Sequence, residues 1–270
     1  MTADDSRGPL DASAVRDAVL GASPHWRRID VVSETGSTNA DLIARASAGE
    51  DIDGAVLIAE HQTAGRGRQG RSWSDVAGAQ ITMSVGVDAA AVPTEAWGWL
   101  PLATGVAIVD AVRDATGIEA GLKWPNDVLA GPGKLAGILA EVAAPQRAIV
   151  VGFGLNVTLR PDEIAVAEAT SLAELGADAP DRVRLIVALL THLSKRIADW
   201  RGAYRTDGTL IADYRSRCLT LGTPVRAVLP DNREITGVAE DVDEQGRLGI
   251  RADGETVTVS AGDVVHLRRI

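Results

Sequence analysis

Arg66, Arg68 and Arg71 alternate with three glycines in the stretch 65–71, which has the sequence GRGRQGR. Arginine carries a permanent charge on a planar donor fork that matches carboxylate and phosphate oxygens. Glycine lets the backbone come close to a ligand and leaves its N–H groups accessible. The pattern indicates a loop that holds more than one anionic group, although a solvated basic loop would have the same composition.

Ser37, Thr38 and Asn39 form a second polar cluster, at the predicted start of a helix. Short polar side chains cap the first N–H groups of a helix, which have no partner within it. The same N–H groups can also bind a polar group of a ligand. Capping alone would explain these three residues, so they become a ligand site only if other chemistry lies nearby.

Two further side chains flank the arginine loop. Gln62 follows a predicted buried strand at 55–59, and its amide can both donate to and accept from a heteroatom ring. Trp73 follows the loop, and its flat face suits stacking on a nucleobase, a contact worth about 1–3 kcal/mol in nucleic-acid complexes. Packing in the core explains a tryptophan equally well.

Asn126, Asp127 and Lys134 lie in a glycine-rich region further along the chain. The first two follow a Trp-Pro pair, which forces an extended or turned backbone. They fit either phosphates, through an amide and a hydrated Mg²⁺, or a simple Asx-turn. Lys134 precedes an apolar run, so it is either a solvated loop charge or an anion ligand.

The sequence contains no recognisable nucleophile–base pair. It has no GxSxG elbow, no His/Cys spacing for a metal and no Walker loop. Cations without a nucleophile predict a site in which two anionic substrates react with each other while the protein neutralises their charge. A carboxylate that attacks a phosphate group has this requirement.

These residues belong to an acidic chain of 270 residues with a formal net charge of −10. Such a chain has no general field for nucleic acid, and no apolar run reaches the roughly 18–20 residues that span a bilayer. The single cysteine, Cys218, fits a reducing compartment, and the N-terminus lacks a signal-peptide core. We expect a cytoplasmic protein that binds neither DNA nor a membrane.

Hydrophobic periodicity predicts the elements that must position the site. We expect a short N-terminal helix, strands at 29–32 and 55–59, a half-buried strand at 81–87, a helix at 94–116, paired strands at 135–142 and 148–157, and a helix at 181–200. Gly152 and Gly154 predict that another group approaches the last of these strands closely.

Five short β runs follow, at 224–229, 234–240, 246–251, 256–260 and 264–267. Their tight spacing predicts a small closed barrel instead of an extension of the main sheet. The predicted division is an N-terminal tail and short helix at 1–28, a main domain at 29–217 and the barrel at 218–270.

Five motifs occur in order: STN at 37–39, GRGRQGR at 65–71 with Trp73, KWPND at 123–127, KLAGIL at 134–139 and GLN at 154–156. This set resembles the biotin protein ligases, also called biotin–[acetyl-CoA-carboxylase] ligases, of the short monofunctional bacterial type. Longer members begin with a DNA-binding helix-turn-helix, for which the N-terminal stretch here is too short. The resemblance implies an α+β fold like that of class II aminoacyl-tRNA synthetases and biotin/lipoate ligases, with a mixed, mainly antiparallel sheet, flanking helices and a C-terminal SH3-like barrel.

The resemblance also implies an ATP-dependent, AMP-forming ligase. Biotin and ATP, with Mg²⁺, would give biotinoyl-5′-AMP in the main, catalytic domain. Biotin would then pass to one lysine of a biotin carboxyl carrier protein domain of an acyl-CoA or pyruvate carboxylase. A lipoate protein ligase, which shares the adenylation chemistry, is the nearest alternative. A nucleic-acid-binding module is disfavoured by the acidic charge, and a non-enzymatic biotin-binding protein by Lys134 and Trp73.

The family's site residues carry over to matching positions of this sequence. By resemblance, biotin contacts Ser37, Thr38, Asn39, Gln62, Arg66, Gly67, Arg68, Lys134 and Gly137. By resemblance, ATP or AMP contacts Arg66, Arg68, Arg71, Trp73, Asn126, Lys134 and Asn156. Lys134 and Arg68 would act on the reacting carboxylate and phosphate. Asp127 would lie beside them or on the metal side, and no metal ligand is assigned.

Overall fold

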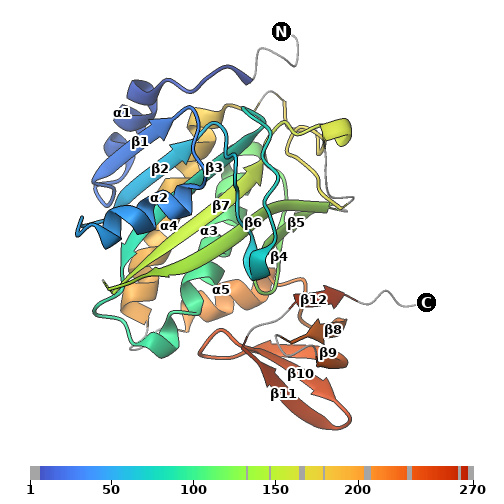
Figure 1. The fold of residues 1–270 in the computed structure, drawn as a ribbon. Helices are drawn as coiled ribbons and strands as arrows, with labels where there is room; N and C mark the ends of the chain where they lie inside the picture. The colour runs from blue at the N-terminus through green and yellow to red at the C-terminus, as the bar shows by residue number, and fades with distance from the viewer. Residues whose placement is uncertain are drawn as a thin grey trace.

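Two β-sheets and five α-helices make up the described part of the computed structural model (Figure 1). It describes residues 7–131, 133–145, 147–163, 168–178, 180–203, 208–229, 233–260 and 263–266. The start of the expected tail, at 1–6, and the end of the expected barrel, at 267–270, lie outside these ranges.

The larger sheet has seven strands in the order β1-β2-β3-β7-β6-β5-β4. Only β1 and β2 run parallel, and every other neighbouring pair is antiparallel, which confirms the expected mixed, mainly antiparallel sheet. The strands are β1 (Arg28–Val32), β2 (Ala55–Ala59), β3 (Gln80–Asp88), β4 (Gly121–Lys123), β5 (Asp127–Ala130), β6 (Gly133–Ala143) and β7 (Ala148–Asn156).

Helices cover both faces of this sheet, because successive side chains of its strands point to opposite sides. In β2, Val56 and Ile58 belong to the larger apolar core, which includes α1, α3 and α4, whereas Leu57 packs in a smaller core with Leu42 of α2. Figure 1 shows α3 and α4 behind the sheet and α2 in front of it. The helices are α1 (Ala12–Ala22), α2 (Thr38–Ser47), α3 (Trp99–Thr116), α4 (Arg182–Ala203) and α5 (Thr209–Arg217).

Strand β3 differs from the half-buried strand that we predicted. It is buried on both faces, and only Asp88 at its end is exposed. Met83 and its apolar neighbours face the larger core, while Thr82 and Ser84, which are 4% and 0% exposed, lie on the side of α2. We predicted that the polar side chains of β3 face solvent, but the layer that contains α2 covers them.

One more expectation needs correction, and two features were not predicted. The helix expected at 94–116 is a short 3-10 turn, η3 (Thr94–Ala96), followed by α3, which ends at Gly117 with a positive φ of 75° as predicted. Helix α5 and the hairpin of β4 and β5 were not predicted. These elements are short, so hydrophobic periodicity had too few residues to reveal them.

The smaller sheet contains the five C-terminal strands, antiparallel and in the order β11-β10-β9-β8-β12. They are β8 (Pro224–Val228), β9 (Glu234–Val242), β10 (Leu248–Ala252), β11 (Glu255–Val259) and β12 (Asp263–His266). Two indole N–H groups hold the turn between β9 and β10: Trp99 donates to Glu244 O at 2.8 Å, and Trp124 donates to Gly246 O at 3.0 Å.

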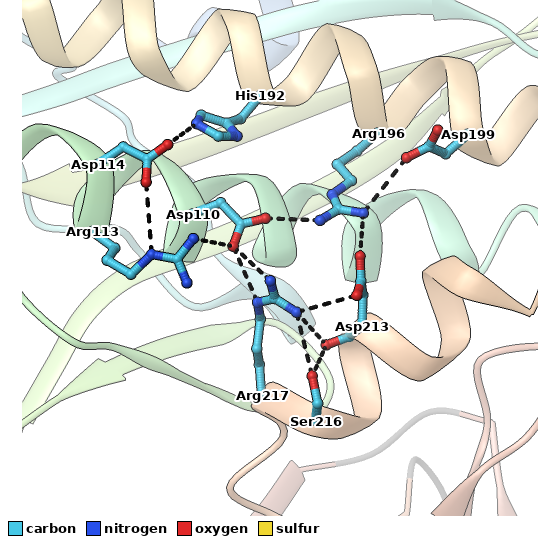
Figure 2. Close-up of polar contacts among 9 residues, drawn as sticks. All are labelled: Asp110, Arg113, Asp114, His192, Arg196, Asp199, Asp213, Ser216 and Arg217. Atoms are coloured by element: carbon cyan, nitrogen blue, oxygen red, sulfur yellow. Dashed lines mark hydrogen bonds and ion pairs between the residues drawn. The ribbon is translucent and has the colours of Figure 1, made fainter.

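An ion-pair network fixes α5 on α3 and α4 (Figure 2). Asp110 is 4% exposed and lies 2.8 Å from both Arg196 Nη2 and Arg217 Nη2, while Arg196 Nη1 lies 2.6 Å from Asp213. Burial alone would raise the pKa of Asp110, but hydrogen bonds from the two arginines outweigh it and lower that pKa. The network therefore anchors the chain just before Cys218, which pairs with Leu122 of β4.

Candidate active site

One cavity of about 430 Å³ gathers the residues singled out in the sequence. Its lining comes from the start of α2, the arginine loop, the turn between β4 and β5, and strands β6 and β7. Every predicted contact residue lines it: Ser37, Thr38, Asn39, Gln62, Arg66, Gly67, Arg68, Arg71, Trp73, Asn126, Lys134, Gly137 and Asn156. Asp127 lines it as well.

Buried, uncharged polar groups line one part of the cavity: Ser37, Thr38, Asn39 and Gln62. We call them the α2 end, together with the buried Ser84, which does not line the cavity but hydrogen-bonds to Thr38 and Asn39. Ser37 caps α2 by accepting from Ala40 N. Thr38 donates to Gln62 Oε1 twice, from its backbone N at 2.8 Å and from its hydroxyl at 3.1 Å. The first turn of α2 is thus tied to the chain that enters the arginine loop.

Asn39 and Ser84 connect this end to the floor of the sheet. Ser84 Oγ lies 2.6 Å from both Thr38 Oγ1 and Asn39 Oδ1. The Asn39 amide donates to Leu139 O at 3.1 Å and to Glu141 Oε2 at 2.8 Å. A β-carbon on Gly152 would stand 2.1 Å from Asn39 Oδ1. The close approach predicted at Gly152 is therefore made by Asn39.

The arginine loop is a compact turn. Trp73 N donates to Gly65 O at 2.9 Å, and Gly67 N donates to Arg71 O at 2.7 Å. Between them lies a 3-10 turn, η2 (Arg68–Gly70), in which Gln69 adopts a positive φ of 55°. A non-glycine residue is uncommon there, so the tight turn is stabilised by its closing hydrogen bonds and not by local preference.

Three positively charged side chains form a second part of the cavity, which we call the cationic wall: Arg66, Arg68 and Lys134. Each has an acceptor on the sheet or its turns. Lys134 Nζ lies 2.6 Å from Asp127 Oδ1, and Arg66 Nη1 lies 3.5 Å from Glu141 Oε1.

Arg68 completes the cationic wall. Its Nη1 donates to Asn126 Oδ1 at 3.2 Å. Asn126 in turn donates to Ile138 O at 3.0 Å. Partly exposed ion pairs and hydrogen bonds of this kind are weak, so an incoming anion can compete for the cations of the wall.

Trp73 lies on two glycines of neighbouring strands. Gly137 of β6 faces Gly154 of β7 in the sheet register. A β-carbon on Gly137 would stand 2.8 Å from the indole, and one on Gly154 would stand 2.4 Å from it. The ring therefore occupies the space of two missing side chains, and Lys134 Nζ lies 5.7 Å from its centroid. The close approach predicted at Gly154 is made by Trp73.

Asn156 lies at the end of β7 and is 3% exposed. Its Oδ1 accepts from Gln80 Nε2 at 2.8 Å, and its amide donates to Thr170 O at 2.9 Å and Lys134 O at 3.3 Å. In addition, Thr170 N donates to Lys134 O at 3.0 Å. Asn156 therefore holds the chain near Thr170 beside Lys134, and thereby forms the wall at this part of the cavity.

Sequence patterns missed several residues that shape the site. Ser84 was one polar position in an alternating strand, and Glu141 stood in an apolar run. Asp75 accepts from Gln62 N at 2.8 Å, and burial is the main cause of its raised pKa. Val264 and Val265 reach the cavity from β12. No local signal marks these two valines, because they belong to the other sheet.

No group of three or more His, Cys, Asp or Glu residues within the described ranges is placed to hold a metal ion. In the same part of the chain, no helix is long and apolar enough to cross a membrane.

Known proteins match most of this chain. The family model described as the biotin/lipoate A/B protein ligase family matches residues 35–156, and the one described as the biotin protein ligase C terminal domain matches 220–267. A biotin–[acetyl-CoA-carboxylase] ligase of Mycobacterium tuberculosis is 57% identical over 98% of both chains. The bifunctional ligase/repressor BirA of Bacillus subtilis is 32% identical over 95% of this chain and 79% of its own length. A biotin protein ligase of Aquifex aeolicus, solved in complex with biotin and ATP, matches 90% of this chain and 100% of its own with a TM-score of 0.77 and 26% identity.

Proposed function

The chain belongs to the biotin protein ligases of the biotin/lipoate A/B protein ligase family, and on this premise we propose that it joins biotin to ATP and then to a lysine of a carrier protein. One observation carries the proposal. A single cavity combines an uncharged, buried α2 end with a cationic wall. A neutral ring that bears a carboxylate, next to a nucleotide, has this distribution of charge.

The α2 end suits the ureido ring of biotin. That ring presents N–H donors and a carbonyl acceptor but no charge, and hydroxyl and amide groups satisfy both kinds. Ser37, Thr38, Asn39 and Gln62 offer such groups within one buried cluster. We assign these four residues to recognition of the ring.

The cationic wall suits the first reaction. An oxygen of the biotin carboxylate attacks the α-phosphorus of ATP, a P–O bond forms, and the bond to pyrophosphate breaks with its electron pair on the pyrophosphate. Two like charges 4 Å apart repel by about 4 kcal/mol at an effective dielectric constant of 20. Arg68 and Lys134 offset that repulsion, and they do so most strongly where negative charge develops.

The remaining residues are assigned to the nucleotide. Trp73 would stack near adenine, and Arg71 and Asn126 would face its phosphates. Asn156 supports that end of the cavity through its contacts with Thr170 and Lys134. Mg²⁺ would enter bound to ATP as part of the substrate, with Asp127 on the metal side once Lys134 turns to the phosphate.

The second reaction releases AMP. The uncharged amine of the acceptor lysine attacks the carbonyl carbon of biotinoyl-5′-AMP and an amide bond forms. AMP leaves with the electron pair of the broken anhydride bond, and the nitrogen releases one proton to water. The proposed acceptor is a biotin carboxyl carrier protein domain of an acyl-CoA or pyruvate carboxylase. The lone Cys218, which is buried and forms no disulfide, fits the cytoplasm, where we place this reaction.

The test is transfer of labelled biotin from biotin and ATP to a purified carrier domain, together with biotin-dependent exchange between ATP and pyrophosphate. We expect both activities, and we expect neither when lipoate replaces biotin. A protein that binds biotin but exchanges no pyrophosphate would be a binding protein instead of a ligase. Calorimetry that detects lipoate binding and no biotin binding would assign the chain to the lipoate branch.

A further inference from the structure

The N-terminal segment 7–10 packs against the chain that follows β7. That chain, at 157–163, gives the cavity Leu159 and Glu163. It continues from Asn156, which the proposed function assigns to the nucleotide end. The N-terminal segment therefore touches the wall of the nucleotide site, although it contributes no residue to the cavity lining.

Arg7 makes the contact. Its guanidinium pairs with Glu163 in a bidentate arrangement, with Nη1 2.8 Å from Oε1 and Nη2 2.9 Å from Oε2. It also donates from Nε to Thr158 Oγ1 at 3.1 Å and from Nη2 to the Thr158 carbonyl. The Arg7 and Glu163 side chains are only 13% and 17% exposed. Bidentate arginine–carboxylate pairs combine charge with fixed geometry.

The rest of the segment is also held by hydrogen bonds to the main domain. Gly8 O accepts from Arg182, and Leu10 N donates to Glu60, which itself pairs with Arg182 at 2.6 Å. A β-carbon on Gly78 would stand 2.7 Å from Arg7 O. The segment thus lies in a notch that a side chain at position 78 would fill.

We propose that Arg7 is a positioning residue for the nucleotide, acting through Glu163. A carboxylate in the wall of a cavity that receives a triphosphate repels its substrate unless a cation neutralises it and holds it in place. Arg7 does both, because it pairs with both carboxylate oxygens and ties the same chain at Thr158. This inference rests on the proposed function, which supplies the nucleotide.

The electrostatics agree with this role. Hydrogen bonding from Arg7 is the largest cause that lowers the pKa of Glu163 from 4.5 to about 2, so the carboxylate is charged at neutral pH. Arg160 also contacts Glu163 at 2.8 Å, but its side chain is 52% exposed. Arg160 is therefore a matched control, because it contacts the same Glu163 carboxylate but has an exposed side chain.

The experiment compares Arg7→Ala, Arg7→Lys and Arg160→Ala with the wild type in the full chain. Calorimetry measures affinity for a non-hydrolysable ATP analogue and for biotin, and pyrophosphate exchange gives KM for each substrate. We expect Arg7→Ala to weaken nucleotide binding and raise KM for ATP about tenfold, with biotin affinity unchanged. Arg7→Lys should restore part of the loss, and Arg160→Ala should change either value less than twofold.

Adding Glu163→Gln to Arg7→Ala separates charge from fold. If the Glu163 carboxylate repels the nucleotide once Arg7 is removed, the double variant binds the nucleotide more tightly than Arg7→Ala alone. A merely structural role would change the affinities for ATP and biotin alike, which would overturn the inference, as would an unchanged ATP affinity in Arg7→Ala. A wild type that binds nucleotide but exchanges no pyrophosphate would refute the proposed function, and the nucleotide affinities would still decide the role of Arg7.

Discussion

The α2 end and the cationic wall face the same cavity but are built differently. At the α2 end, Thr38, Gln62 and Ser84 are at most 8% exposed and bond to one another within the protein. In the wall, Lys134 and Arg66 have side chains 31% and 46% exposed, and they pair with carboxylates. Under the proposed function, the first region would need only small adjustments to receive the neutral ring, whereas the second would exchange protein partners for substrate anions.

Because the two regions are built differently, we expect one to control affinity and the other to control the reaction rate. A buried network that is already satisfied is rigid, and it offers the same shape before and after the reaction. Interactions that strengthen only when charge develops lower the barrier instead. We therefore expect variants of the α2 end to change binding of biotin, and variants of the wall to change the rate of adenylation.

Removing Lys134 from the cationic wall should have the largest effect. Lys134→Ala is expected to slow biotin-dependent pyrophosphate exchange about 10²–10³-fold, as for loss of one preorganised donor in other enzymes. Its melting temperature should stay close to that of the wild type, because the partly exposed pair with Asp127 contributes about 0–1 kcal/mol. Lys195→Ala, on the exposed surface of α4, is the control. A wild-type rate in Lys134→Ala would remove the distinction between the two regions.

Adding a side chain at Gly154, one of the two glycines against which Trp73 packs, should have the next largest effect. In Gly154→Ala the new methyl group would stand 2.4 Å from the indole and displace it. Overpacking of this kind costs about 1–3 kcal/mol, so nucleotide affinity should fall by about 5- to 150-fold. Calorimetry with an ATP analogue measures the loss. Gly202→Ala in α4 meets no atom within 4 Å and should behave as the wild type.

A substitution at the α2 end should have a smaller effect, on the affinity for biotin and not on the reaction rate. Ser84→Ala removes a hydroxyl that lies 2.6 Å from both Thr38 and Asn39, so biotin affinity should fall by about 1 kcal/mol, roughly fivefold. The rate at saturating biotin should be unchanged. Ser47→Ala, exposed at the end of α2, is the matched control. A lower saturated rate in Ser84→Ala would show that the α2 end also acts in catalysis.

The smallest effect concerns stability in acid. Hydrogen bonding from Arg7 is the largest cause that lowers the pKa of Glu163 from 4.5 to about 2. The pair therefore stabilises the fold above about pH 4.5 and loses its contribution as pH falls toward 2. Urea unfolding should show a larger free energy of unfolding for the wild type than for Arg7→Ala at pH 7. This difference between the two proteins should decrease between about pH 4.5 and 2. A gap independent of pH would mean that Arg7 acts through packing alone.

Much of this fold could be predicted because long elements carry their own signal. The alternating residues of β3 and the apolar stripe of α3 marked both elements, and Ser37 marked the start of α2. The hairpin of β4 and β5 escaped prediction, since its strands have only three and four residues. Burial of β3 on both faces also escaped, because α2 is a separate layer that no pattern within β3 reveals.

Residue types and their local spacing are enough to show which side chains carry charge, where the chain turns and which motifs identify the family. The partners of these side chains emerge only when the chain is folded: Asn39 with Glu141, Trp73 with Gly137 and Gly154, and Arg7 with Glu163. They could not be predicted because the partners lie far apart along the chain. Local propensities act over a few residues, whereas these contacts join residues that are up to 156 positions apart and depend on strand register and on the packing of layers.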